Sequence, residues 1–196
     1  MDDRIRCFGE TPLYARYHDE EWGVPVHDDR THFELICLEG AQAGLSWETI
    51  LRKRDGYREV FHGFEPERVA AMSDAELGDA ASNPAIVRHK GKIESVRKNA
   101  RAFLALAERE GDFDPWVWTF VDGAPIVGHW PRREDVPAVT DEATALSKAL
   151  KKAGFGFVGP TTMYAYMQAA GLVDDHFGGC WKRQAAGAST GSGSSQ

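Results

Sequence analysis

Hydrophobic residues recur along most of this chain at intervals of three and four positions, the spacing that places them on one face of an α-helix. Two such faces are Phe33, Ile36, Cys37 and Gly40, and then Ile93, Val96, Ala100, Phe103 and Leu104. Strict alternation, which would indicate strands, is missing apart from a short ambiguous stretch at 116–121. The pattern predicts an all-α protein of about eight helices.

Polar residues at the expected ends of several helices support this interpretation. Ser73 and Glu76 have the spacing of a capping box, in which each side chain binds the other residue's backbone N–H. Asp141 and Glu142 place negative charge in the first turn of a helix that ends in lysines, as the helix dipole favours. Gly154 then suits a left-handed helix end.

The composition is that of a globular protein, with 42% hydrophobic and 27% charged residues among 196. We expect one domain over 1–184, followed by a disordered Gly/Ser-rich tail at 185–196. No stretch approaches the roughly 20 apolar residues that span a bilayer, and the charged first residues do not resemble a signal peptide. Three dispersed cysteines favour a reducing compartment, so we expect a cytoplasmic protein without membrane association.

A net charge of −7 makes nucleic-acid binding depend on a locally basic face. One candidate is the stretch 88–101, which has six basic residues and a single acid, Glu94. The six are Arg88, Lys90, Lys92, Arg97, Lys98 and Arg101. A solvated helix face is the alternative interpretation, so charge alone neither supports nor excludes DNA.

Two Cys/His pairs stand at opposite ends of the chain: Cys7 with His18, and His176 with Cys180. Thiolate and imidazole are the ligands that zinc prefers, and four of them complete a tetrahedral structural site. If the pairs meet, a metal joins the two ends of the domain. The alternative is that these residues are unrelated, because ten residues between Cys and His is not a common zinc spacing.

The segment 146–162 indicates a helix, a tight turn and a second helix. Gly154 and Gly159 mark the helix end and the next helix start, with Gly156 between them and Pro160 at a first helical position. Phe155, Phe157 and Val158 are expected to anchor the turn in the core. Backbone N–H groups near the second helix start would then contact a phosphate without reading sequence, although an ordinary helical corner has the same pattern.

Aromatic residues and one carboxylate suggest a pocket for a flat ring. Tyr14, Tyr17 and Trp22 are clustered among charged neighbours, and side chains of this kind both stack and hydrogen-bond. Glu39 falls on an otherwise apolar helix, where a carboxylate is costly unless it is paired or used. Core packing and a surface position are the alternatives for these residues.

Leu45 follows Gly44 on a predicted tight turn, with Ser46 as a helix cap before Trp47. An exposed leucine on a turn is suited to act as a wedge in a base stack. The alternative is that Leu45 packs inward.

Taken together, these segments resemble the bacterial 3-methyladenine DNA glycosylase I family of the helix-hairpin-helix superfamily. The resemblance runs from Cys7 to Cys180 and is carried by PLYARYHDEEWGVP, LICLEGAQAGLSW, IVRHKGKIESVRKNARAF, ALSKALKKAGFGFVGPT and YMQAAGLVDDHFGGC. It implies one structural zinc, held by Cys7, His18, His176 and Cys180. It also implies a base pocket in which Glu39 and Tyr17 read the methylated adenine and Trp47 stacks on it, with Tyr14 and Trp22 nearby. Phe8 stands where the best-known members have a tryptophan.

The implied function is excision of 3-methyladenine from double-stranded DNA, with Glu39 as the residue that favours the cationic base. No acid follows the hairpin before Asp174, so we expect no water-activating aspartate at that position. We also expect no lysine nucleophile, and therefore a monofunctional enzyme without strand cleavage. Leu45, Gly154, Gly156 and Gly159 are the expected DNA contacts. We expect a monomer acting at the nucleoid. A zinc-dependent hydrolase and a non-catalytic module that binds damaged DNA are the alternative functions.

Overall fold

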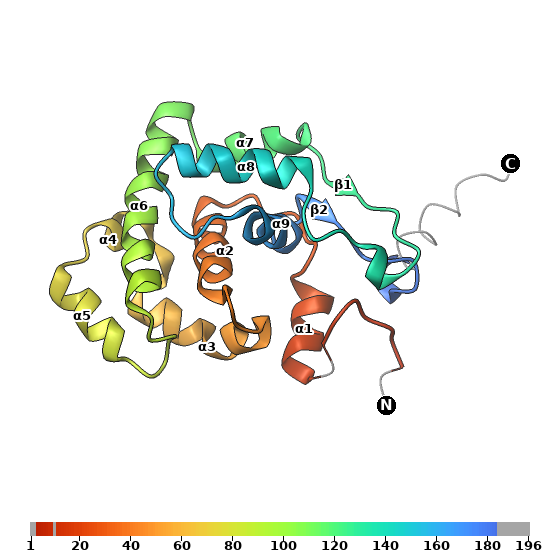
Figure 1. Cartoon of the computed structure of the whole chain (residues 1–196), viewed down its shortest axis with the longest axis horizontal. Coiled ribbons are helices and arrows are strands. Elements are labelled where there is room, and N and C mark those ends of the chain that lie inside the picture. Colours follow the sequence, from red (N-terminus) through yellow and green to blue (C-terminus); the bar gives the residue numbers. More distant parts are fainter. Residues whose placement is uncertain (1–2, 10, 184–196) are drawn as a thin grey trace, which may run out of the picture.

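Helices make up most of the computed structural model, which describes residues 3–9 and 11–183 (Figure 1). Within these ranges lie nine α-helices: α1 Pro12–Glu20, α2 Asp29–Gln42, α3 Trp47–Val60, α4 Pro66–Ala70, α5 Asp74–Ser82, α6 Lys90–Glu110, α7 Phe113–Trp118, α8 Asp141–Lys152 and α9 Pro160–Ala169. Three short 3-10 helices are η1 His62–Phe64, η2 Thr119–Val121 and η3 Arg133–Asp135. No helix of this part of the chain has the length and apolar character needed to cross a membrane. The tail predicted at 185–196 lies outside the described residues.

Two short strands correct the all-α prediction. β1 (Ile126–Val127) and β2 (Val173–Asp174) pair in parallel, with Ile126 opposite Val173 and Val127 opposite Asp174. A strand of two residues is too short to show alternation in a sequence, which explains why the pattern missed it. The ambiguous stretch at 116–121 is helical, since it spans the end of α7 and η2.

Helix α2 lies at the centre of the fold, and α3, α6 and α9 pack against it (Figure 1). All ten residues from 32 to 41 are buried, so this helix has no solvent-facing side over that length. A helix that is surrounded in this way needs apolar residues on every face. The two carboxylates within this buried stretch, Glu34 and Glu39, are therefore the informative exceptions.

The predicted caps are confirmed. Ser73 and Glu76 form the capping box of α5, and Ser46 caps α3 by accepting from the Thr49 N–H. Pro160 is the first residue of α9, with Gly159 as its N-cap. Gly154 ends α8 with φ +102°, a conformation that favours glycine. These local signals fix where the helices start and stop around the candidate site.

Candidate functional site

A pocket of about 120 Å³ lies between α1, α2, α3 and α9. It is lined by Phe8, Tyr14, Tyr17, Trp22, Glu39, Gln42, Trp47, Ala165 and Gln168, and we call it the aromatic pocket. All five residues predicted to bind a base are in this lining. The structure thus brings together side chains from four helices that are far apart in the sequence.

The pocket's aromatic walls come largely from α1 and from the segments directly before and after it. Tyr17 is buried on this helix, and its ring centroid lies 5.5 Å from that of Trp47. Phe8 precedes the helix and packs on Tyr14 and Trp22, with ring centroids 4.9 Å from each. Phe8 therefore supplies a further ring at the position where the family's best-known members have a tryptophan.

The two buried carboxylates of α2 have opposite environments. Glu34 is paired, with Oε1 at 2.5 Å from Arg54 Nε and 2.9 Å from Arg58 Nη2. Glu39 is 4% exposed, and its Oε2 has no hydrogen-bond partner among the described residues. A buried carboxylate without a partner is costly, so the fold retains Glu39 at the expense of stability. That cost is explained if a ligand supplies the partner.

The environment around Glu39 is dry and poor in compensating charge. Burial raises the pKa of Glu39 to about 8. Burial also raises the pKa of Tyr17 well above its usual value, and the nearby Glu39 adds to that effect. The buried indole N–H of Trp47 likewise has no hydrogen-bond partner among the residues that the structure describes. The pocket therefore offers an acceptor and a donor that remain unsatisfied until something binds.

The raised pKa of Glu39 predicts a pH dependence of stability. The unfolded chain releases this proton near pH 4.3, whereas the folded chain holds it until about pH 8. The contribution of protonated Glu39 to the free energy of unfolding is therefore fully present below about pH 4.3 and is lost as the pH rises to about 8. We expect Glu39→Gln to gain stability relative to the wild type over this window, by up to about 1.4 kcal/mol per pH unit. Urea unfolding of both proteins from pH 5 to 9 measures it. Parallel pH profiles would show that Glu39 is not held in a dry site.

Gln168 and Gln42 are pocket residues that the sequence analysis missed. Gln168 Nε2 donates to Asp175 Oδ2 at 2.8 Å, and the same buried carboxylate accepts from Trp130 Nε1 at 2.6 Å and from the Tyr164 hydroxyl. Asp175 thereby fixes the orientation of the Gln168 amide. Gln42 did have a signal, because it follows Glu39 by three residues and so shares its helix face.

Beside the aromatic pocket, the predicted zinc ligands converge. Ligand atoms of Cys7, His18 and Cys180 lie within 4.8 Å of one another, and all three residues are buried. The ring of His176 lies 5.2 Å from that of His18, and its buried Nε2 has no hydrogen-bond partner within the described part of the chain. Trp22 contacts this cluster as well as the pocket, since its ring packs on His176 at 4.6 Å.

The donors of this cluster fit a zinc ion. His18 Nδ1 lies 2.8 Å from Asp19 Oδ1, and His176 Nδ1 lies 2.6 Å from Asp174 Oδ1. Carboxylates in these positions direct both Nε2 atoms inward, the arrangement common for metal-binding histidines. The two buried thiols share a hydrogen bond that lowers the pKa of Cys180 and raises the pKa of Cys7, so without a metal one of the pair is favoured as the thiolate and the other keeps its proton.

The turn between α8 and α9 differs partly from the prediction. Phe155 and Val158 are buried, but Phe157 is 40% exposed with φ +56°, so it does not anchor the core. The Gly156 N–H donates to Asn99 Oδ1 at 2.8 Å, and its carbonyl accepts from Asn99 Nδ2 at 3.1 Å. The Gly154 N–H donates to Lys151 O. These two amides are therefore already used within the protein and cannot serve as free phosphate donors as predicted.

Gly159 keeps the geometry that was predicted for it. As the N-cap of α9 it accepts from the Met163 N–H, and within the described ranges its own N–H has no hydrogen-bond partner. Leu45 lies on the turn between α2 and α3, where Gly44 has φ +81°, and it is 40% exposed. The alternative that Leu45 packs inward is therefore wrong.

Known proteins match this chain along nearly its whole length. The sequence pattern of the methyladenine glycosylase family matches residues 7–183. The chain is 48% identical over 180 residues to the DNA-3-methyladenine glycosylase of Haemophilus influenzae, which covers 92% of this chain and 97% of that protein. A crystal structure of 3-methyladenine DNA glycosylase I superimposes with a TM-score of 0.88 at 49% identity, covering 91% of this chain and 98% of the other.

A second solved structure concerns the ligand directly. It is a tyrosine-to-phenylalanine variant of 3-methyladenine DNA glycosylase I in complex with 3-methyladenine, with a TM-score of 0.87 and 39% identity over 89% of this chain and 94% of the other. Fold and pocket define a helical protein that can enclose a flat ring against a buried carboxylate. The chain belongs to the methyladenine glycosylase family.

Proposed function

We propose that this protein excises 3-methyladenine from alkylated double-stranded DNA by hydrolysing the N-glycosidic bond. The observation that carries the proposal is Glu39, a buried carboxylate without a partner in an aromatic pocket. The relatives named as DNA-3-methyladenine glycosylases and the complex with 3-methyladenine support it. We propose further that the protein acts as a monomer, since the pocket's lining as described needs no residue from a second chain, and that it works at the nucleoid, where its substrate is.

The reaction follows from the charge of the lesion. Methylation at N3 gives the base a positive charge, so the bond from C1′ to N9 breaks with its electron pair moving to the base, which leaves neutral. Water adds to C1′ and loses a proton. The leaving group needs no strong acid, and the protein's task is to extrude the base and to select the cationic one.

Selection is electrostatic. As the cation enters, Glu39 releases its proton to the solvent, and the carboxylate then accepts an N–H of the base once the base fills the pocket. Trp47 and Tyr17 offer ring faces on which a cationic base stacks more strongly than neutral adenine. An unmodified adenine would leave the buried Glu39 either protonated or uncompensated, and so would bind less well.

We infer that the enzyme does not cleave the DNA strand. Cleavage of that kind needs an amine nucleophile, and among the described residues no lysine lines the aromatic pocket. The buried Lys92 is engaged elsewhere, since its Nζ donates to Ala41 O at 2.8 Å and Ala43 O at 2.5 Å. The first acids after the hairpin are Asp174 and Asp175. Asp174 is hydrogen-bonded to His176 and Asp175 to Gln168, so neither is assigned the role of a water-activating aspartate.

The test is to incubate methylated duplex DNA with the protein and to measure released bases and strand breaks separately. We expect free 3-methyladenine and intact strands that break only after alkaline treatment. Tight binding of the lesion without release would favour the non-catalytic binding module, and direct strand breaks would contradict the monofunctional mechanism.

One zinc ion held by Cys7, His18, His176 and Cys180 completes the proposed enzyme. When bound, it would supply no chemistry to the base and would act structurally, because four protein ligands leave no position for water. This argues against the zinc-dependent hydrolase, whose metal needs an open position. Removal of zinc should reduce stability and activity together, whereas a hydrolase would lose activity first.

The pair α8 and α9 would form the helix-hairpin-helix that contacts the DNA backbone. The free N–H of Gly159 at the start of α9 supports this, since helix N-termini attract phosphate. Phe157, on the turn between these helices, is exposed, and its ring lies 6.3 Å from that of His89, the N-cap of α6. Gly159 rather than Gly154 or Gly156 is then the amide that binds phosphate.

Leu45 should act as a wedge in the duplex. The exposed side chain can fill the gap that the extruded nucleotide leaves, which offsets part of the cost of unstacking. We expect Leu45→Ala to lose about tenfold or more in excision from duplex DNA, given about 1.5–3 kcal/mol for burying a leucine. Single-turnover excision from duplex and single-stranded DNA measures the effect, which should be smaller on the single strand.

Val139→Ala is a suitable control, because Val139 is 41% exposed but does not line the pocket. Both variants should have the same melting temperature as the wild type. Equal losses on duplex and single-stranded DNA would rule out the wedge.

A further inference from the structure

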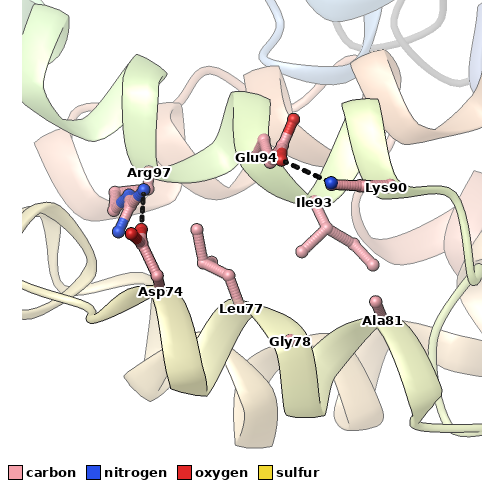
Figure 2. Close-up of a pocket in the computed structure, with 8 residues that line it drawn as sticks. All are labelled: Asp74, Leu77, Gly78, Ala81, Lys90, Ile93, Glu94 and Arg97. Carbon is pink, nitrogen blue, oxygen red and sulfur yellow. Dashed lines mark hydrogen bonds and ion pairs between the residues drawn. The ribbon is translucent and has the colours of Figure 1, made fainter.

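The basic stretch at 88–101 is largely engaged within the protein. Figure 2 shows Arg97 paired with Asp74, at 2.7 Å, and Lys90 paired with Glu94, at 3.8 Å, beside a hollow between α5 and α6. This hollow shares no residue with the aromatic pocket. Arg101 donates to Ala70 O at 3.0 Å. Arg88 and Lys98 form no hydrogen bond or ion pair among the described residues, but none of the six basic residues lines the aromatic pocket, so a cation for a phosphate at that pocket comes from another part of the chain.

Arg133 on η3 is such a cation. It is exposed, and within residues 3–9 and 11–183 its guanidinium forms no hydrogen bond or ion pair with a side chain or the backbone. Its neighbour Arg132 is fully engaged, with Nη2 at 2.6 Å from Asp135 Oδ1 and Nη1 at 3.3 Å from Glu134 Oε1. One short helix thus presents one free and one satisfied arginine.

Arg133 lies beside the aromatic pocket. It lines a second cavity, of about 190 Å³, that shares Phe8, Trp22 and Gln168 with that pocket. Its charge also reaches Tyr14: burial raises the pKa of Tyr14, the carboxylates of Glu39 and Glu48 add to this, and Arg133 acts in the opposite direction. The pairing of β1 with β2 holds the loop that carries η3 against this region.

A nucleotide whose base fills the aromatic pocket leaves its two phosphates at the entrance, within one nucleotide's length of the base. A guanidinium is well suited to a phosphate there, because its N–H groups bind two oxygens at once. We propose that Arg133 binds a backbone phosphate of the extruded nucleotide and so holds the open conformation of the damaged strand. This inference rests on the proposed function.

The test is binding to duplex DNA with a stable abasic-site analogue, measured by fluorescence anisotropy across a salt series. We expect Arg133→Ala to bind about tenfold more weakly, since a hydrogen bond to a charged group is lost. The slope of log K against log salt should fall in magnitude by about 0.9, the value for one phosphate contact. Arg132→Ala, the matched control, should keep the wild-type slope, and free 3-methyladenine should bind all three proteins equally.

Methylphosphonate substitution locates the contact. Neutralising one phosphate beside the abasic site should weaken the wild type and Arg132→Ala about tenfold, but should leave Arg133→Ala unchanged. The inference is overturned if the deficit in affinity of Arg133→Ala relative to the wild type is the same whichever phosphate is neutralised, or if that deficit is as large on undamaged DNA. Either result would mean that the contact is not to the extruded nucleotide. Base release by the wild type is scored separately, so the glycosylase proposal can fail or stand independently.

Discussion

Glu39→Gln should bind free 3-methyladenine about 10- to 150-fold more weakly than the wild type, which corresponds to the 1.5–3 kcal/mol of a hydrogen bond to a charged group. The amide keeps the shape of the side chain but removes the carboxylate that accepts an N–H of the base, and with it the negative charge that favours the cationic base before the glycosidic bond breaks. Excision should fall at least as far, because the charge on the base is present until the bond breaks. Titration with free base, followed by intrinsic tryptophan fluorescence, measures the first effect, and single-turnover excision measures the second.

Glu34→Gln provides the matched control on the same helix. Glu34 is paired with Arg54 and Arg58 rather than facing the pocket, so its replacement should cost stability and leave base affinity unchanged. If Glu39→Gln binds the base as tightly as the wild type does, the assigned role of Glu39 is wrong.

Cys180→Ala should lose the bound zinc and should be about 4–5 kcal/mol less stable, in the range of metal-site losses. For a chain of this size that is a fall of about 8–20 °C in Tm. The cause is local: the residues around His18 and those around Cys180 are brought together at this cluster. Part of the connection remains, since Asp19 also accepts from Arg6 and from the Trp181 indole. Elemental analysis and thermal unfolding measure the result.

Cys37→Ala controls for the loss of a buried thiol. Cys37 lies on α2, is 5% exposed and is not part of the Cys/His cluster. It should retain one zinc per chain and lose less stability. An unchanged metal content and Tm in Cys180→Ala would refute the structural zinc.

Much of the site could be predicted because local chemistry marks it. Caps and helix ends depend on neighbouring residues, so Ser73, Ser46 and Gly154 were recognisable from the sequence. Glu39 was recognisable because a charge on a buried helix needs a reason. The Cys/His pairs were recognisable by residue type, although only the fold shows that the two ends of the chain meet.

Other features depend on tertiary contacts that a sequence does not encode locally. Phe157 is as apolar as Phe155, but the turn exposes one and buries the other. The sequence predicts a free backbone N–H at Gly156, but in the fold this N–H donates to Asn99, which lies on a helix distant in the sequence. The basic stretch at 88–101 suggested a DNA-binding face, and its partners Asp74 and Ala70 O are placed there only by folding.

Product analysis of alkylated duplex DNA tests the central claim most directly. After incubation with the wild type, the released bases are separated and identified by mass, with Glu39→Gln run in parallel. The proposed selection for a cationic methylated adenine predicts 3-methyladenine in the wild-type reaction, no unmodified adenine, and much less product from Glu39→Gln. An absence of 3-methyladenine, or its equal release by both proteins, would contradict the proposal.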